Sequence, residues 1–308
     1  MDLTLFQSPE WENFKLKTGY QKSHRVDGIL VLQKSLPLGR TMLYSPMISQ
    51  NQESRIKNQE FIDEIEKIGR EDNSIFYRME LNFPIIHDSS PIIHKRFIKA
   101  FEEMQPENNW VLDITKPEEE ILTGMKQKGR YNIKIAEKSG LSFTSSKEKD
   151  SKELNAFYSQ YAETGKRHKI SFRAKSYFEK LLEILQEKDY ASVYTVWHEN
   201  IPLASAVIVF YGGAAIYLYG GSSDSHRELM APYLLHWNII KEAKERNLNE
   251  YNFLGIAPDD DGNHPWSGIT RFKKQFGGYQ ADVVGSYDLP LKPMEYKAFK
   301  IAEKLRRH

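Results

Sequence analysis

The chain has 308 residues, of which 40% are hydrophobic and 28% charged, enough apolar material for two ordinary domains or one large one. Its 43 basic and 42 acidic residues leave a net charge of +1, so any surface for nucleic acid has to be local. The lack of cysteine excludes disulfides, thiolate metal sites and a cysteine nucleophile. The first residues carry an acid and no apolar run, unlike a signal peptide, so a cytoplasmic location is expected.

Helical and alternating patterns succeed one another through the first third of the chain. The predicted helices are 11–18, 54–69 and 92–104, and the predicted strands are 28–33, 41–44, 74–81 and 110–114. Ser45-Pro46 is expected to end the second of these strands. Residues 106–109 mark the boundary between two mixed α/β blocks.

The second block repeats this style. Its predicted helices are 118–139, 151–164, 176–187, 232–246, 271–276 and 294–307, and its strands are 191–197, 203–211, 214–220, 250–254 and 281–287. The order strand–strand–strand–helix–strand over residues 191–254 is typical of a GNAT-like acyltransferase core. The predicted fold class is therefore mixed α/β (α+β).

Residues 201–223 carry no charge, and their length would suit a membrane-spanning helix. Gly212-Gly213 interrupts the stretch, and β-branched and aromatic residues flank it. This pattern favours two buried strands joined by a glycine turn.

The segment at 271–278, Arg-Phe-Lys-Lys-Gln-Phe-Gly-Gly, combines features of an anion site. Glycines let the backbone approach a ligand, and a lysine beside them can bind phosphate or stabilise an oxyanion. We expect Phe272 to anchor the turn in the core while Lys273 projects the other way. The alternative is a solvated basic turn.

Basic residues four apart are expected to line one side of the helix that follows Pro117, with Ile133, Ile135 and Ala136 facing inward. Such a face either binds nucleic-acid phosphates or is simply a solvated helix surface. The basic residues are Lys126, Lys128, Arg130, Lys134 and Lys138.

Two features argue against cofactors. The turn 224–232 has no glycine, and Pro232 has no N–H to offer a pyrophosphate, which disfavours a CoA donor. The acidic run 259–263 lacks the downstream glutamate of a calcium loop, and His168, His226 and His264 show no ligand spacing. We therefore expect neither a metal nor a cofactor.

Several motifs, in the same order, resemble those of the FemABX peptidyltransferase family. Besides 271–278, they lie at 8–20, 110–113, 128–133, 167–173 (Arg167-His168-Lys169-Ile170 with Arg173) and 217–222. The resemblance covers nearly the whole chain, most weakly over 45–107. It implies two GNAT-like domains packed around a cleft, the first from residues 1–107 plus 284–308 and the second from 108–283.

The resemblance also implies an activity. A family member of this kind transfers an amino acid from aminoacyl-tRNA to the diamino-acid amine of a peptidoglycan precursor, either UDP-MurNAc-pentapeptide or lipid II. It is expected to be a monomer, touching the membrane peripherally if lipid II is the acceptor. The alternatives are a Fem-like transferase acting on a protein N-terminus or an exopolysaccharide, and a non-catalytic binder of wall precursors.

By position, the resemblance assigns Lys273 and Phe272 to catalysis. We expect the basic residues of 126–138 to bind tRNA. Tyr217 and Tyr219 are expected to share one strand face. The substrate-binding positions implied by the family are Lys15, Glu80, Arg173, Tyr177, Tyr217 and Tyr219.

Overall fold

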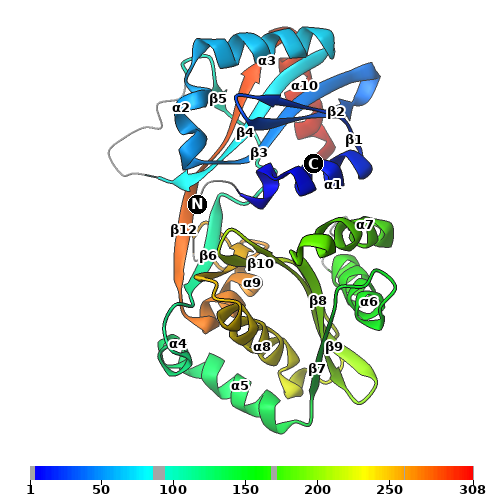
Figure 1. Cartoon of the computed structure of the whole chain (residues 1–308), viewed down its shortest axis with the longest axis vertical. Helices are drawn as coiled ribbons and strands as arrows, with labels where there is room; N and C mark the ends of the chain where they lie inside the picture. The colour runs from blue at the N-terminus through cyan, green and yellow to red at the C-terminus, as the bar shows by residue number, and fades with distance from the viewer. Residues whose placement is uncertain (1–3, 86–93, 168–171, 260, 308) are drawn as a thin grey trace. The chain divides into compact units, whose positions relative to one another are not determined.

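The structure is a computed structural model that describes residues 4–85, 94–167, 172–259 and 261–307. Residues 168–170 of the arginine–histidine motif, and residue 260 of the acidic run, lie outside this description. The chain divides into two compact units: unit 1 comprises residues 1–107 and 282–308, and unit 2 comprises residues 108–281. Figure 1 labels most of the helices and strands of both units.

Unit 1 is built on a mixed sheet in the order β1-β2-β3-β4-β12, with β5 paired to β12. Its neighbouring strands are antiparallel except β3 and β4, which run parallel. The strands are β1 Tyr20–Val26, β2 Ile29–Leu36, β3 Arg40–Ser49, β4 Ser74–Pro84, β5 Ile98–Lys99 and β12 Tyr279–Pro290, whose first three residues belong to unit 2. The helices are α1 Pro9–Lys17, α2 Glu53–Ile56, α3 Gln59–Glu71 and α10 Pro293–Arg307, and the 3-10 turns are η1 Leu5–Gln7, η2 Pro37–Gly39 and η3 Gln50–Gln52.

The helices of unit 1 follow from local sequence chemistry. The Ser8 hydroxyl caps α1 by accepting a hydrogen bond from the Trp11 amide at 3.1 Å, and Pro9 suits the first turn. Helix α3 places Phe61, Ile65 and other apolar residues on one side, where they are buried in the core with residues of β4.

A buried ion pair ties residues 282–308 to the rest of unit 1. Arg78 on β4 donates two hydrogen bonds to Asp288 on β12, at 2.7 and 2.8 Å. The hydroxyl of Tyr296 on α10 donates to the same carboxylate at 2.6 Å. Because a buried charge without its partner is strongly destabilising, this network fixes β12 and α10 in unit 1.

Unit 2 is built on a sheet in the order β6-β11-β10-β9-β8-β7, in which β10 and β11 run parallel and the other neighbours antiparallel. Helices α6 and α8 pack on opposite faces of β8–β10 (Figure 1). The strands are β6 Asn108–Asp113, β7 Ser142–Ser146, β8 Ala191–His198, β9 Ile201–Tyr211, β10 Ala214–Ser222 and β11 Glu250–Gly255. The helices are α4 Glu118–Gly124, α5 Gln127–Lys138, α6 Lys152–Arg167, α7 Lys175–Leu185, α8 Ala231–Glu245 and α9 Ser267–Lys273, with 3-10 turns η4 Gln186–Lys188, η5 Arg227–Leu229 and η6 Lys274–Phe276.

The sequence predicted the central part of unit 2 correctly. The uncharged stretch 201–223 forms β9 and β10, joined at Gly212 and Gly213 with φ of 59° and 84°. The order β8-β9-β10-α8-β11 confirms the expected acyltransferase-like core. Within the described residues, no helix is both long and apolar enough to cross a membrane.

Two of the predictions for unit 1 were wrong. The described part of the predicted helix 92–104 contains β5 instead, because its backbone pairs with β12, as in the bond from the Ala100 amide to the Ser286 carbonyl at 2.9 Å. The strand predicted to end at Pro46 continues to Ser49. A register shift between Ser45 and Ile48, with Met47 at φ 45°, accommodates the proline as a bulge.

Other predictions misjudged element boundaries. The predicted helix 118–139 is two helices, since Met125 and Lys126 are extended with ψ of 154° and 149°. The predicted helix 54–69 is likewise divided into α2 and α3 at Lys57-Asn58. Strands β1 and β7 were missed because both are half-exposed and lack a clear apolar alternation.

Candidate functional site

Lys273, the last residue of α9, is buried rather than solvated, with 5% of its surface exposed. Its Nζ donates a hydrogen bond to the carbonyl of Gly255 at 2.5 Å and lies 5.9 Å from the centre of the Tyr217 ring. Burial lowers the pKa of Lys273 to about 7. This excludes the solvated-turn alternative for Lys273, and a buried amine with a strongly shifted pKa is typical of functional sites.

An aromatic cluster supports the segment that carries Lys273. Phe272 packs on Tyr233 of α8 at a ring distance of 5.2 Å, as the sequence predicted for an anchor. His236, also on α8, contacts the rings of Phe272 and Phe276 at 5.4 and 5.5 Å. Burial, and then the charge of Lys273, lower the pKa of His236 to about 3, so this imidazole is neutral.

The sequence did not single out His236. A lone histidine on an apolar helix face is usually a core residue, and the sequence carries no signal of its partners. In the structure its Nδ1 forms a hydrogen bond with the hydroxyl of Tyr251 at 2.8 Å, and its ring packs edge-on to Tyr217 at 4.6 Å. His236 therefore holds Tyr217 and the Phe272–Lys273 turn in one packed unit.

Tyr217 and Tyr219 lie on opposite faces of β10, contrary to the prediction that they share a face. The register with β9 shifts between them, so Leu218 is the extra residue of a β-bulge. Tyr217 contacts His236 on α8, whereas Tyr219 contacts the α6 and α7 side. The bulge thereby gives each face of β10 a tyrosine.

The Tyr217 hydroxyl is available for hydrogen bonding. Within the described residues it has no hydrogen-bond partner, and burial raises its pKa to about 12, so it stays protonated. Gly220 makes room for it, because a Cβ at position 220 would overlap the Tyr217 hydroxyl. The hydroxyl of the half-buried Tyr217 and the amine of the buried Lys273 thus lie in the same region of unit 2.

On the other face of β10, three predicted substrate-binding residues come together. The Tyr177 and Tyr219 hydroxyls are 3.1 Å apart, and the exposed Arg173 guanidinium lies 5.0 Å from the centre of the Tyr177 ring. Helix α6 approaches β10 closely at Gly221, where a Cβ would come within 2.7 Å of the backbone of Gln160 and Tyr161.

The glycines at 277 and 278 serve packing, not the close approach to a ligand that the sequence suggested. Gly277 and Gly278 have φ of 75° and 89°. A Cβ on Gly277 would come within 2.7 Å of the Gly124 carbonyl oxygen, and one on Gly278 would overlap the Val111 carbonyl. The backbone therefore turns sharply against β6 and α4, which fixes the end of the Lys273 segment.

Helix α5 presents most of the predicted basic face. Lys126, Lys128, Lys134 and Lys138 are exposed, while Ile133 and Ala136 are buried and Ile135 is half-buried. Arg130 differs, because its guanidinium donates to the carbonyls of Thr123 and Met125 and so closes the end of α4. Four lysines of this set thus remain directed to solvent.

Lys15 and Glu80 belong to unit 1. The Lys15 ammonium lies over three rings, those of Trp11, Phe14 and Tyr20, at 5.3, 5.7 and 5.0 Å. It is only 9% exposed.

Glu80 is engaged inside unit 1. Its carboxylate accepts hydrogen bonds from the amides of Met104 and Gln105 at 2.9 and 2.7 Å, and from the Tyr44 hydroxyl. Burial raises its pKa to about 7. These contacts give Glu80 a structural task, holding residues 104–105 against β4, which the sequence did not indicate.

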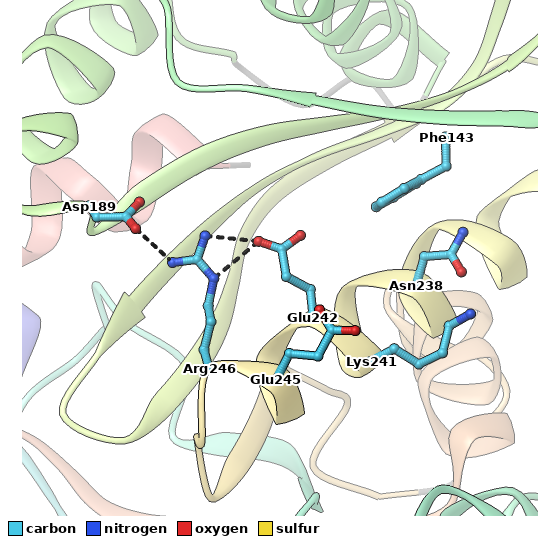
Figure 2. Close-up of a pocket in the computed structure, with 7 residues that line it drawn as sticks. All are labelled: Phe143, Asp189, Asn238, Lys241, Glu242, Glu245 and Arg246. Atoms are coloured by element: carbon cyan, nitrogen blue, oxygen red, sulfur yellow. Dashed lines mark hydrogen bonds and ion pairs between the residues drawn. The ribbon is translucent and has the colours of Figure 1, made fainter.

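A shallow depression on α8 contains none of the predicted residues (Figure 2). Three of its charged residues are paired with one another: Arg246 binds Glu242 at 2.8 Å and Asp189 at 3.2 Å. Arg246 also stacks on Phe210 at 4.0 Å. This ion network stabilises the fold and leaves the Lys273 region as the better candidate site.

Within the ranges that the structure describes, no cluster of three or more histidines, aspartates or glutamates could hold a metal ion. In the turn before α8, a proline occupies the first turn of the helix, and its nitrogen has no hydrogen to offer a phosphate.

Comparison with known proteins identifies the family of the chain. The family model described as the FemAB family matches residues 89–196 and 189–304. The chain belongs to the FemAB family. The FemAB relatives include the lipid II:glycine glycyltransferase of Staphylococcus aureus (strain USA300), which is 24% identical in an alignment that covers 70% of this chain and 69% of the relative.

Solved structures agree on the fold. The crystal structure of FemX aligns with a TM-score of 0.83 at 20% identity, over 96% of this chain and 94% of that one. L-PGS from Bacillus licheniformis aligns with a TM-score of 0.55 at 15% identity, over 95% of this chain and 94% of that one. A tandem GNAT protein from the clavulanic acid biosynthesis pathway aligns with a TM-score of 0.52 at 9% identity, over 92% of this chain and 94% of that one. The predicted fold class, mixed α/β with two GNAT-like domains, is confirmed, whereas a cleft between them stays a prediction.

Proposed function

We propose that this FemAB-family aminoacyltransferase moves an amino acid from aminoacyl-tRNA to the stem-peptide amine of a peptidoglycan precursor. The FemAB match and the relative named lipid II:glycine glycyltransferase support amino-acid transfer to such precursors. The observation that carries the residue-level proposal is the buried Lys273 beside the Tyr217 ring.

The proposed reaction is aminolysis of an ester that is already activated. The acceptor amine attacks the ester carbonyl, a C–N bond forms, and the C–O bond to the tRNA ribose breaks. The proton lost by the amine ends on the departing ribose oxygen. No covalent enzyme intermediate is needed, so the protein has to align the amine and stabilise the oxyanion.

Lys273 and Tyr217 are suited to that oxyanion. The side-chain amine of Lys273, which at a pKa of about 7 is charged below neutral pH and neutral above it, donates to the Gly255 carbonyl at 2.5 Å, and the protonated Tyr217 hydroxyl supplies a second donor. In a buried region, positioned donors stabilise developing charge more strongly than they would in water. Phe272 and His236 act through packing, by holding both donors in place.

The substrates are assigned by charge and chemistry. The exposed Arg173, together with Tyr177 and Tyr219, is proposed to hold acceptor phosphate, since a guanidinium forms bidentate bonds to phosphate. Lys15 is proposed as an acceptor contact from unit 1. The exposed lysines of α5 are proposed to bind tRNA phosphates. The chain is proposed to act in the cytoplasm as a monomer.

A transfer assay tests the proposal. The chain is incubated with a mixed pool of charged tRNAs and with either UDP-linked pentapeptide or lipid II. The mass of the acceptor is then measured by mass spectrometry. We expect an added aminoacyl mass that disappears when the tRNA pool is treated with ribonuclease. If neither acceptor gains mass with any charged tRNA, the proposal fails.

A further inference from the structure

Helix α10 has one face anchored in unit 1. Tyr296 is 2% exposed, and it packs with the half-buried Phe299 against Phe76 at ring distances of 5.2 and 5.5 Å. The Lys300 side chain reaches back over Phe101, with Nζ 5.8 Å from that ring. The helix is therefore held firmly on its inner side.

Its opposite face is apolar and exposed. Met294, Ile301 and Leu305 are 86%, 62% and 72% exposed, and the exposed Ala298 and Ala302 lie between them. At the helical spacing these five residues fall within an arc of about 100° and form one stripe, called here the α10 outer face. Three large apolar side chains exposed in line need an explanation that single surface residues do not.

Cations border this stripe. Lys297 and Lys304 are exposed and project beside it on one edge, and Arg306 lies on the other. The two acids of the helix are paired: Glu295, at the edge of the stripe, with Arg40 at 2.5 Å, and Glu303 with Arg306 at 2.6 Å. An apolar stripe edged by basic residues is the pattern of helices that lie on anionic membranes.

We propose that the α10 outer face docks on the surface of an anionic lipid bilayer. Apolar side chains would enter the boundary of the acyl chains while Lys297 and Lys304 meet the headgroups. A tRNA would satisfy the cations but not Met294, Ile301 and Leu305. Pairing two copies through this face would bring the lysine edges of two helices together, and like charges would oppose the contact.

This inference deepens the proposed function and rests on it in one respect: a chain seated on a bilayer would draw its acceptor from lipid-linked precursors. The docking itself is independent of catalysis. It is therefore measured first, with lipid vesicles and no substrate.

The test is flotation with vesicles of phosphatidylcholine alone or mixed with phosphatidylglycerol. Wild type should float with the mixed vesicles and much less with phosphatidylcholine alone. Ile301→Glu combined with Leu305→Glu should lower partitioning tenfold or more, because two apolar side chains leave the bilayer boundary. Lys297→Gln and Lys304→Gln should each lower it by roughly fivefold, and less so at high salt.

Ile201→Glu is the matched control, since Ile201 is 44% exposed at the start of β9 and lies outside α10. It should float like wild type, and circular dichroism should show all variants folded. Flotation of the Ile301→Glu/Leu305→Glu protein at the wild-type level would overturn the proposal. So would a wild-type dimer in light scattering that this double substitution dissociates, because the face would then bind a second copy.

The transfer assay separates this inference from the proposed function. The double variant should transfer to soluble UDP-linked pentapeptide at the wild-type rate, yet lose tenfold or more with lipid II in vesicles. Equal transfer to lipid II by both proteins would contradict the link between docking and acceptor. Vesicle binding by a wild type that transfers to no acceptor would instead refute the proposed function and leave the docking intact.

Discussion

At the residue scale, the burial of Lys273 changes what its replacement is expected to do. A solvated lysine can be removed with little effect on stability, but Lys273 is 5% exposed with a pKa lowered to about 7. In the unfolded chain its pKa returns to about 10.4. The unfolded state therefore binds more protons between about pH 7 and 10, and wild-type stability rises with pH across that window.

The first prediction is a pH-dependent stability difference between wild type and Lys273→Met. Below pH 7 the wild type carries a buried ammonium that methionine lacks, so the stability of the variant relative to wild type is greatest there. From pH 7 to 9 the free energy of unfolding of the wild type should rise, relative to that of the variant, by up to about 1.4 kcal/mol per pH unit. Urea unfolding at pH 6, 7, 8 and 9 measures this difference. A difference that does not vary with pH would show that Lys273 keeps an ordinary pKa.

The second prediction concerns the Tyr217 hydroxyl. Tyr217→Phe keeps the ring that packs on His236 and removes only a group that bonds to nothing in the described residues. Stability should therefore change little, whereas loss of one oxyanion donor should lower the transfer rate by about 100-fold. Tyr190→Phe, on another aromatic pair in unit 2, is the control. Full activity of Tyr217→Phe would remove this hydroxyl from the proposed mechanism.

At the element scale, the turn after α9 depends on backbone-to-backbone contact. Gly278 has φ of 89°, and a Cβ there would overlap the carbonyl of Val111 on β6. A side chain is therefore excluded both by the backbone conformation and by the lack of space. This glycine is therefore one of the residues that hold the Lys273 segment in place.

The third prediction compares two glycines of this segment. Gly278→Ala should lower the free energy of unfolding by roughly 2 to 4 kcal/mol, from left-handed strain and overpacking together. Gly268→Ala, in α9 with nothing within 4 Å of its Cβ position, should be neutral or slightly stabilising. Chemical denaturation of both proteins measures the contrast. Equal stability of the two variants would mean that the turn is not packed as described.

At the scale of the whole molecule, the even charge balance means that the proposed tRNA binding has to use a local surface, such as that of α5. The fourth prediction uses Lys128, Lys134 and Lys138, which are exposed, and leaves Arg130 intact because it caps α4. Changing the three lysines to glutamine should weaken tRNA binding and flatten its dependence on log salt by roughly two to three units. Filter binding from low to high salt measures the slope, and an unchanged slope would make α5 a merely solvated helix.

The sequence predicted the overall architecture better than the site geometry. The uncharged hairpin and the order β8-β9-β10-α8-β11 follow from periodicity and glycine placement, which are local signals. The opposite facing of Tyr217 and Tyr219 depends on a bulge set by pairing with β9, which no local pattern encodes. The burial of Lys273 and its contact with the Gly255 carbonyl likewise arise from residues distant in sequence.

The same limit explains the errors. Residues 94–104 have helical spacing. However, the backbone of residues 98–100 pairs with β12, nearly 190 residues away along the chain, and this pairing excludes a helix. The sequence likewise did not indicate that the Glu80 carboxylate accepts hydrogen bonds from the amides of residues 104 and 105, whereas the substrate-binding role of Glu80 stays a prediction. Such pairings between distant segments override local propensity.

The most direct test of the central claim is single-turnover transfer by wild type and Lys273→Met, with saturating charged tRNA and a peptidoglycan precursor. A folded variant should lose on the order of 100- to 1,000-fold in rate while still binding both substrates, because the lysine acts on charge that develops during the reaction. Transfer by folded Lys273→Met at the wild-type rate would contradict the account.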